Sequence, residues 1–220
     1  MKTRALNRNQ AGFSLLEMMV VVTIGIIITV IAIPGFISTQ RYLRMAGDLR
    51  ALNGITAQAK MRAAAEFTHA RAYADLAAGT YHLELWNKAG NGGTGCWQTD
   101  GDTANACTAA SSPVLNLSTG DVFSFGTLGT GPTPGQPAPT QAAACRQGAP
   151  GVPGGGGTIG NTACIEFNSR GIPVDNTGAP LATGALYIYN NVVVDGVTVS
   201  ATGSIQTWSS PASSATWYPQ

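Results

Sequence analysis

The chain has 220 residues, of which only 10% are charged and 28 are glycine, and its formal net charge is +1. This low charge content, with many Gly, Ala, Ser and Thr residues, argues against a helical cytosolic enzyme. It is typical of an exported domain made of strands and loops.

The first twelve residues form a short basic leader. Residues 1–12 contain Lys2, Arg4 and Arg8 and no acid. A secretory signal places its apolar core before the small-residue cleavage site. Here the only suitable cut, after Gly12, comes before the apolar segment. We therefore expect the leader to be removed and the apolar segment to remain in the mature protein.

Residues 13–33 form an apolar run that is long enough to cross a membrane. Its 21 residues span about 31 Å as a helix, which matches a bilayer core of about 30 Å. The basic leader predicts a cytoplasmic start, so the C-terminal bulk crosses the inner membrane. A charge inside such a span costs about 2.5–3.5 kcal/mol at the bilayer centre, so the single acid, Glu17, should have a partner.

The segment after the span predicts a second helical half. Pro34 lacks an amide hydrogen and Gly35 follows it, so we expect a kink or local loosening there. Apolar residues then recur at steps of three and four from residue 36 to about 66, which indicates an amphipathic helix packed on a sheet. The predicted core stripe is Tyr42, Leu43, Met45, Ala46, Leu49, Leu52, Ile55, Ala59 and Ala63.

The rest of the chain predicts strands separated by a long loop. Residues 80–87 alternate as a strand with Tyr81, Leu83 and Leu85 on one side, which places His82 at the surface on the other. Asp195 and Gly196 indicate a turn or bulge. Residues 126–163 are too rich in Gly and Pro to bury a core and predict a partly mobile surface loop. The further strand candidates are 114–117, 122–125, 184–189, 192–201 and 203–208.

Four cysteines lie in the exported part: Cys96, Cys107, Cys145 and Cys164. An even number in an oxidising compartment predicts two disulfides. Three pairings are possible, and we favour Cys96–Cys107 with Cys145–Cys164, because each would close a polar loop of low apolar content. A thiolate metal site is disfavoured, since there is no C-x-x-C spacing and no histidine nearby.

No catalytic constellation is present in the sequence. The chain has two histidines, His69 and His82, and its glycine-rich segments lack the Gly-Lys-Ser/Thr ending of a phosphate loop. We therefore expect no enzyme activity, no catalytic residue, no cofactor and no metal.

The N-terminal residues resemble the class III signal of type IV pilins and pseudopilins. The match is Gly12, the run Phe-Ser-Leu-Leu-Glu-Met-Met-Val-Val from Phe13, and Pro34 at the far end of the span. The resemblance implies that a prepilin peptidase cuts after Gly12 and methylates the new N-terminus, Phe13. It also implies that Glu17 pairs with the N-terminal ammonium of a neighbouring subunit, with Pro34 in the assembly helix. The alternative is an uncleaved signal anchor, with Glu17 near the membrane interface.

The C-terminal half is similar to GspH/FimT-type pseudopilins and minor pilins. The similarity lies in the phrase Ile-Glu-Phe-Asn-Ser-Arg-Gly-Ile-Pro at 165–173 and the ending Gly-Ser-Ile-Gln-Thr-Trp at 203–208. The fold implied is α+β and pilin-like: a long N-terminal α-helix, transmembrane in its first half, packed on antiparallel β-sheet with disulfide-stapled loops.

These observations divide the chain and give it an expected role. We expect a cleaved prepilin leader at 1–12, a transmembrane and filament-core helix at 13–35, its amphipathic continuation at 36–67, and a β-rich periplasmic or extracellular domain at 68–220. The expected function is a minor pilin or pseudopilin of a type IV pilus or type II secretion pseudopilus. Its partners would be prepilin peptidase, other subunits and, before assembly, the inner membrane.

Two alternatives remain open. One is a major pilin. The other is a DNA-binding minor pilin for natural transformation, which needs exposed clusters of Lys and Arg. From residue 72 onward there are three basic side chains against eight acids, and six of the remaining basic residues lie within 36–71. The acidic outer domain therefore argues against nucleic acid as a partner.

Overall fold

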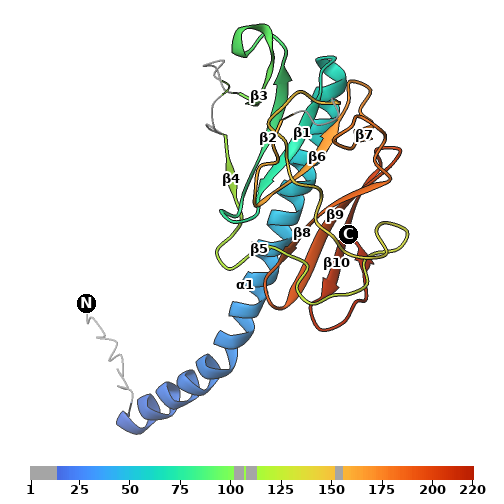
Figure 1. Cartoon of the computed structure of the whole chain (residues 1–220). Helices are drawn as coiled ribbons and strands as arrows, with labels where there is room; N and C mark the ends of the chain where they lie inside the picture. Colours follow the sequence, from blue (N-terminus) through green and yellow to red (C-terminus); the bar gives the residue numbers. More distant parts are fainter. Residues whose placement is uncertain (1–13, 102–106, 108–112, 152–155) are drawn as a thin grey trace, which may run out of the picture. The chain divides into compact units, whose positions relative to one another are not determined.

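A computed structural model describes residues 14–101, 107, 113–151 and 156–220 (Figure 1). A single long helix, α1 (Leu15–Ala65), precedes two antiparallel sheets, which confirms the predicted α+β class. The chain divides into two compact units, Met1–Arg41 and Tyr42–Gln220. Helix α1 contributes residues to both units and passes through Pro34 without an interruption.

The second half of α1 buries one face against the sheets. Met45, Leu52, Ala59 and Ala63 have no exposed surface, and Leu49 has almost none. With the buried Thr56, these positions recur every three or four residues, as the amphipathic pattern predicts.

The predicted stripe begins too early. Tyr42 and Leu43 are 52% and 63% exposed, so their assignment to the core is wrong. The apolar periodicity of the sequence continues past the point where the domain ends, and only residues from Met45 onward find a sheet to pack against.

The first sheet is built around the strand that follows the helix. Its order is β3-β2-β1-β6-β7, and β4 adds a further pairing to β2. A short 3-10 helix, η1 (Asn91–Gly93), separates β2 from β3. The strands are β1 (Ala70–Asp75), β2 (Thr80–Asn87), β3 (Cys96–Thr99), β4 (Leu115–Asn116), β6 (Thr162–Phe167) and β7 (Pro173–Val174).

The second sheet has the order β11-β10-β9-β8-β5. Its central strands are long and rich in β-branched and aromatic residues, which favour a pleated, buried surface. The strands are β5 (Val122–Phe123), β8 (Thr183–Tyr189), β9 (Val193–Ser200), β10 (Ile205–Pro211) and β11 (Tyr218–Pro219).

One hydrophobic core joins α1 to both sheets. In β1 the small residues Ala70, Ala72 and Ala74 alternate toward this core, and Ile165 and Phe167 of β6 lie beside them in register. From the second sheet, Leu186, Ile188, Val197 and Val199 complete the core. Small residues in β1 allow the helix to approach the sheet closely, because alanine adds no bulk beyond its Cβ.

The turn or bulge predicted at Asp195 and Gly196 is wrong. Strand β9 pairs without a break, and Tyr187 of β8 lies opposite Gly196. A Cβ on Gly196 would collide with the Tyr187 ring. Glycine is therefore required at this position by the packing of an aromatic ring across the strands rather than by a turn.

Most of the region predicted as a long loop has no strand of its own. Between β5 and β6, individual hydrogen bonds attach the described loop residues to the second sheet. The Gln141 side chain, for example, donates to the Tyr187 carbonyl at 2.8 Å and accepts from the Tyr187 amide at 2.9 Å. The structure forms the disulfides Cys96–Cys107 and Cys145–Cys164. The second of these joins the loop to β6. Strand β6 begins at Thr162, so the last two residues of the predicted loop, 162 and 163, belong to the strand.

Candidate assembly interface

The apolar first half of α1 begins with a capped turn. The amide of Glu17 donates to the Ser14 hydroxyl oxygen at 3.2 Å, and the amide of Met18 donates to the Ser14 carbonyl at 3.2 Å. Serine is a preferred N-cap because its oxygen satisfies an amide that has no partner within the helix. Glu17 lies in this first turn, where the positive end of the helix dipole favours a negative charge.

From Leu15 to Ile33 every side chain is exposed. The large ones include Leu15, Met19, Ile28 and Ile31, whose exposed fractions lie between 61% and 79%. Such a continuous apolar surface is not found on an isolated soluble domain and indicates contact with lipid or with other chains. Among the described residues α1 is the one helix that is long and apolar enough to cross a membrane.

The polar groups inside this half make their hydrogen bonds within the helix. The Thr23 hydroxyl donates to the Met19 carbonyl at 2.8 Å, and the Thr29 hydroxyl donates to the Gly25 carbonyl at 2.7 Å. An unsatisfied polar group would be costly in an apolar environment. The exposed Glu17 carboxylate is therefore the polar feature of this surface that still requires a partner from outside the helix.

The predicted site residues are only partly covered by the structure. Glu17 lies in the first turn of α1 and is exposed. Pro34 lies within the helix. Gly12 and Phe13, the predicted cleavage and methylation positions, lie outside the described residues. Their roles stay predictions.

A family model for the prokaryotic N-terminal methylation motif matches residues 7–33. This range contains the end of the leader, Gly12, and the whole apolar run with Phe13 and Glu17. Comparison with curated proteins and with solved structures gave no match to this chain.

The motif and the exposed apolar helix point in the same direction. The chain carries the signal of type IV pilins, followed by a long N-terminal helix. The motif supports a type IV pilin-like substrate of prepilin processing, and the apolar helix is consistent with membrane anchoring.

A second region, on the face of the first sheet opposite α1, contains buried charges that the sequence analysis missed. The Arg71 side chain donates through Nε to Glu84 at 2.5 Å and through Nη1 to the carbonyl of Arg146 at 2.7 Å. Its guanidinium lies 4.0 Å from the centre of the Trp97 ring, a cation–π contact. Arg71 is only 2% exposed. The sequence did contain a signal for this strand: Ala70, Ala72 and Ala74 alternate with larger residues, as expected for a strand with two different faces.

The prediction that His82 lies at the surface is wrong. His82 is 2% exposed, stacks on Tyr73 with ring centres 4.6 Å apart, and its Nε2 lies 3.2 Å from Glu84. Burial alone would raise the pKa of Glu84, but the His82 hydrogen bond and the Arg71 charge hold it below its usual value. The loop that carries Cys145 covers this face, and a sequence pattern within one strand cannot show that cover.

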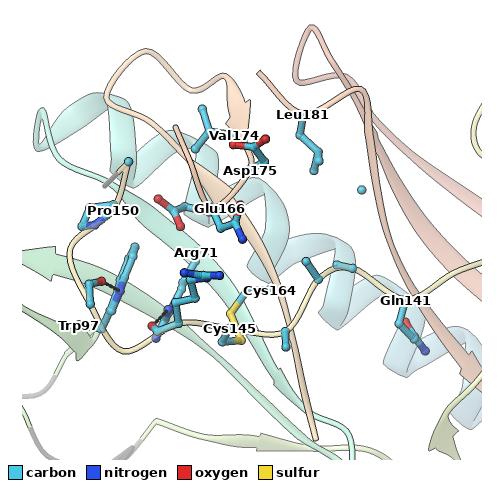
Figure 2. Close-up of a pocket in the computed structure, with 18 of the residues that line it drawn as sticks. Arg71, Trp97, Gln141, Cys145, Pro150, Cys164, Glu166, Val174, Asp175 and Leu181 are labelled. Atoms are coloured by element: carbon cyan, nitrogen blue, oxygen red, sulfur yellow. Dashed lines mark hydrogen bonds between the residues drawn. A yellow bond between two sulfur atoms is a disulfide. The ribbon is translucent and has the colours of Figure 1, made fainter. Parts of the chain in front are cut away.

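A cavity of about 350 Å³ opens beside the Cys145–Cys164 disulfide. Figure 2 shows Arg71 and Trp97 at one side, with Glu166 and Asp175 across from them. Three of these charged groups already have partners: Arg71 binds Glu84, Glu166 lies 2.8 Å from His69, and Asp175 accepts from the turn that follows it. The described residues place no group of three or more His, Cys, Asp or Glu side chains where it could hold a metal ion.

Proposed function

We propose that this protein is a minor pilin or pseudopilin of a type IV pilus or type II secretion pseudopilus. Its assembly element is the first half of α1, after prepilin peptidase has removed residues 1–12. The observation that carries this proposal is the fully exposed apolar surface at Leu15–Ile33, with one acid in its first turn, inside the matched methylation motif.

Each segment of the chain has its own role in this proposal. Residues 13–35 serve as a membrane anchor and then as filament core, residues 36–67 continue the helix, and residues 68–220 form the outer domain. The basic leader favours a cytoplasmic start and a periplasmic domain. Two disulfides suit that oxidising side of the membrane. After assembly the domain lies outside the cell in a pilus, or in the periplasm in a pseudopilus.

Glu17 acts in assembly as a device that sets the axial position of one helix against the next. In an apolar filament core a carboxylate is tolerated when an opposite charge reaches it, and removing one partner of a buried pair is costly. The freed N-terminal amine of residue 13 in a neighbouring copy supplies that charge. Axial positions that leave Glu17 unpaired are then disfavoured.

Two arginines near the end of α1 and in β1 are engaged with carboxylates, which does not favour the DNA-binding alternative. Arg71 is buried against Glu84, and Arg62 binds both Glu66 at 2.8 Å and Asp100 at 2.9 Å. These guanidinium groups are engaged with carboxylates of the same chain. Phosphate binding requires cations that are free to replace counterions.

Processing is tested by the mass of the mature N-terminus. We expect a protein that begins at residue 13 and carries one added methyl group. Gly12→Asp should block cleavage and leave a precursor that is heavier by the mass of residues 1–12. Gln10→Asp introduces the same charge nearby and serves as the matched control, with normal cleavage expected. A mature protein that still begins at Met1 would contradict the proposal.

The abundance of the subunit separates a minor from a major pilin. In sheared filaments a minor subunit is scarce relative to another pilin, whereas a major subunit dominates. We expect the scarce pattern. Quantitative mass spectrometry of sheared filaments makes this comparison.

A further inference from the structure

One charged residue at the cavity beside the Cys145–Cys164 disulfide has no partner. Arg146 lines this cavity of about 350 Å³ and is partly buried. In the part of the chain that the structure describes, its buried Nε has no hydrogen-bond partner, and no ion pair includes it. A buried donor without an acceptor is costly, and more so when it carries a charge. A bound group that accepts from this guanidinium would remove that cost.

The loop that carries Arg146 is held firmly against the first sheet. The Arg146 carbonyl accepts from Nη1 of Arg71 at 2.7 Å. The amide of Cys145 donates to the Thr162 hydroxyl oxygen at 3.0 Å, and the Cys145 carbonyl accepts from the Ile159 amide at 2.8 Å. The disulfide joins the same residue to β6. The backbone of Arg146 is therefore already in place, and a ligand would not have to order it.

Arg71 adds further donors at the same side of the cavity. Its Nε donates to Glu84 and its Nη1 to the Arg146 carbonyl, and a guanidinium has more N–H groups than these two contacts use. The Trp97 ring lies 4.0 Å from the guanidinium and covers one of its faces, which leaves the edge as the part that can donate. Glu84 balances the charge of Arg71, so Arg146 gives this side its net positive charge.

The opposite side of the cavity is acidic. Glu166 of β6 and Asp175, which follows β7, lie across from Arg71 (Figure 2). Oδ1 of Asp175 accepts from the Thr177 side chain and amide and from the Ala179 amide. These hydrogen bonds hold the pKa of Asp175 below its usual value, so the group is negatively charged. They all go to Oδ1, which leaves Oδ2 able to accept from a ligand.

These opposed charges restrict the chemistry of a ligand. The planar fork of a guanidinium matches a carboxylate. A phosphate dianion would meet Glu166 and Asp175 as like charges. The described residues place no group of three or more His, Cys, Asp or Glu side chains where it could hold a metal ion. A cavity of about 350 Å³ lies at the lower end of the range for small-molecule sites.

We propose that this cavity binds a small zwitterion. Arg146 and Arg71 bind its carboxylate, and Asp175 and Glu166 accept from its ammonium group. Free amino acids and short peptides have this chemistry. The inference does not depend on filament assembly, because all the residues that line the cavity belong to the unit Tyr42–Gln220.

Calorimetric titration of the full mature chain in detergent micelles tests the proposal. Glycine, glycylglycine and triglycine serve as probes, because they carry the two charges at increasing separations. We expect at least one of them to bind with a Kd of about 1 mM or lower. Acetate and ethylamine carry one charge each and should bind at least about tenfold more weakly. Failure of all the zwitterions to bind, or tighter binding of inorganic phosphate, would overturn the proposal.

Variants of the two charged sides identify the residues that bind. Arg146→Met should weaken binding of the best zwitterion at least about tenfold, since it removes a charge-assisted hydrogen bond. Arg170→Met removes an exposed arginine that does not line the cavity and should bind as the wild type does. Equal affinities of these two variants would contradict the proposal.

Two conservative variants separate lost binding from lost folding. Arg146→Lys keeps the charge without the planar fork, so its affinity should fall between those of the wild type and Arg146→Met. Asp175→Asn keeps Oδ1 and its turn, and it should weaken binding of the zwitterion but leave that of acetate unchanged. Thermal unfolding of each variant verifies that it is folded. If Asp175→Asn weakens acetate and zwitterion equally, the acidic side does not bind the ammonium group.

Discussion

The first half of α1 and the outer face of the first sheet invert the usual distribution of side chains. From Leu15 to Ile33 apolar side chains are exposed, whereas Arg71, His82 and Glu84 are buried beneath a loop. The buried charges are paired within the chain, and Arg71 Nε lies 2.5 Å from the Glu84 carboxylate. Within the part of the chain that the structure describes, nothing covers the apolar side chains from Leu15 to Ile33. A large apolar surface that the fold leaves exposed indicates a site of contact with a membrane or with other chains.

The largest effect should come from breaking the buried ion pair. Arg71→Met leaves Glu84 charged and without its main partner, so we expect a loss of about 3–5 kcal/mol in the free energy of unfolding. Arg62→Met breaks an ion pair that is 47% exposed at the arginine, and should cost at most about 1 kcal/mol. Denaturant unfolding of the disulfide-intact protein, followed by tryptophan fluorescence, measures both.

A double variant sharpens this prediction. Replacing Arg71 and Glu84 together with Met removes both charges, and apolar replacement of a whole buried pair is often nearly neutral. The double variant should therefore recover most of the stability lost by Arg71→Met alone. If the two substitutions simply add, the pair does not act as a unit.

The next largest effect is the loss of stability when an apolar residue of α1 is shortened to alanine, and it should differ between the two halves of the helix. Leu52 is fully buried, so Leu52→Ala should cost about 2–5 kcal/mol of the stability of the domain. Ile24 is 51% exposed, so Ile24→Ala should change the stability by less than about 0.5 kcal/mol. The same unfolding measurement in detergent gives both values. Equal losses would mean that the first half also packs on the domain.

Local patterns predicted much of this fold. The alternation at 80–87 predicts β2 with its observed bounds, and the apolar runs at 184–189 and 192–201 lie within two residues of β8 and β9. The methylation motif is a contiguous sequence, so the sequence alone reveals it.

What the sequence did not predict depends on contacts between distant segments. Strand β1, Ala-Arg-Ala-Tyr-Ala-Asp, has no β-branched residue, and it forms because β2 and β6 pair with it on both sides. His82 is buried because a loop more than fifty residues away covers its face of the sheet. Gly196 was wrongly predicted to mark a turn. The glycine is needed there because the Tyr187 ring on the neighbouring strand leaves no room for a Cβ, and a local sequence pattern cannot show this.

The central claim is that Glu17 needs a charged partner from another copy of the chain. Incorporation of Glu17→Gln into sheared filaments or pseudopili, relative to its amount in the inner membrane, tests this claim most directly. Glutamine keeps the size of the side chain and removes its charge. Glu66→Gln makes the same change at an exposed position just after the C-terminal end of α1 and serves as the control. We predict that Glu17→Gln inserts into the membrane normally but is depleted from filaments by at least about tenfold, the effect of losing about 1.4 kcal/mol of pairing. Incorporation of Glu17→Gln at the level of Glu66→Gln would contradict the account.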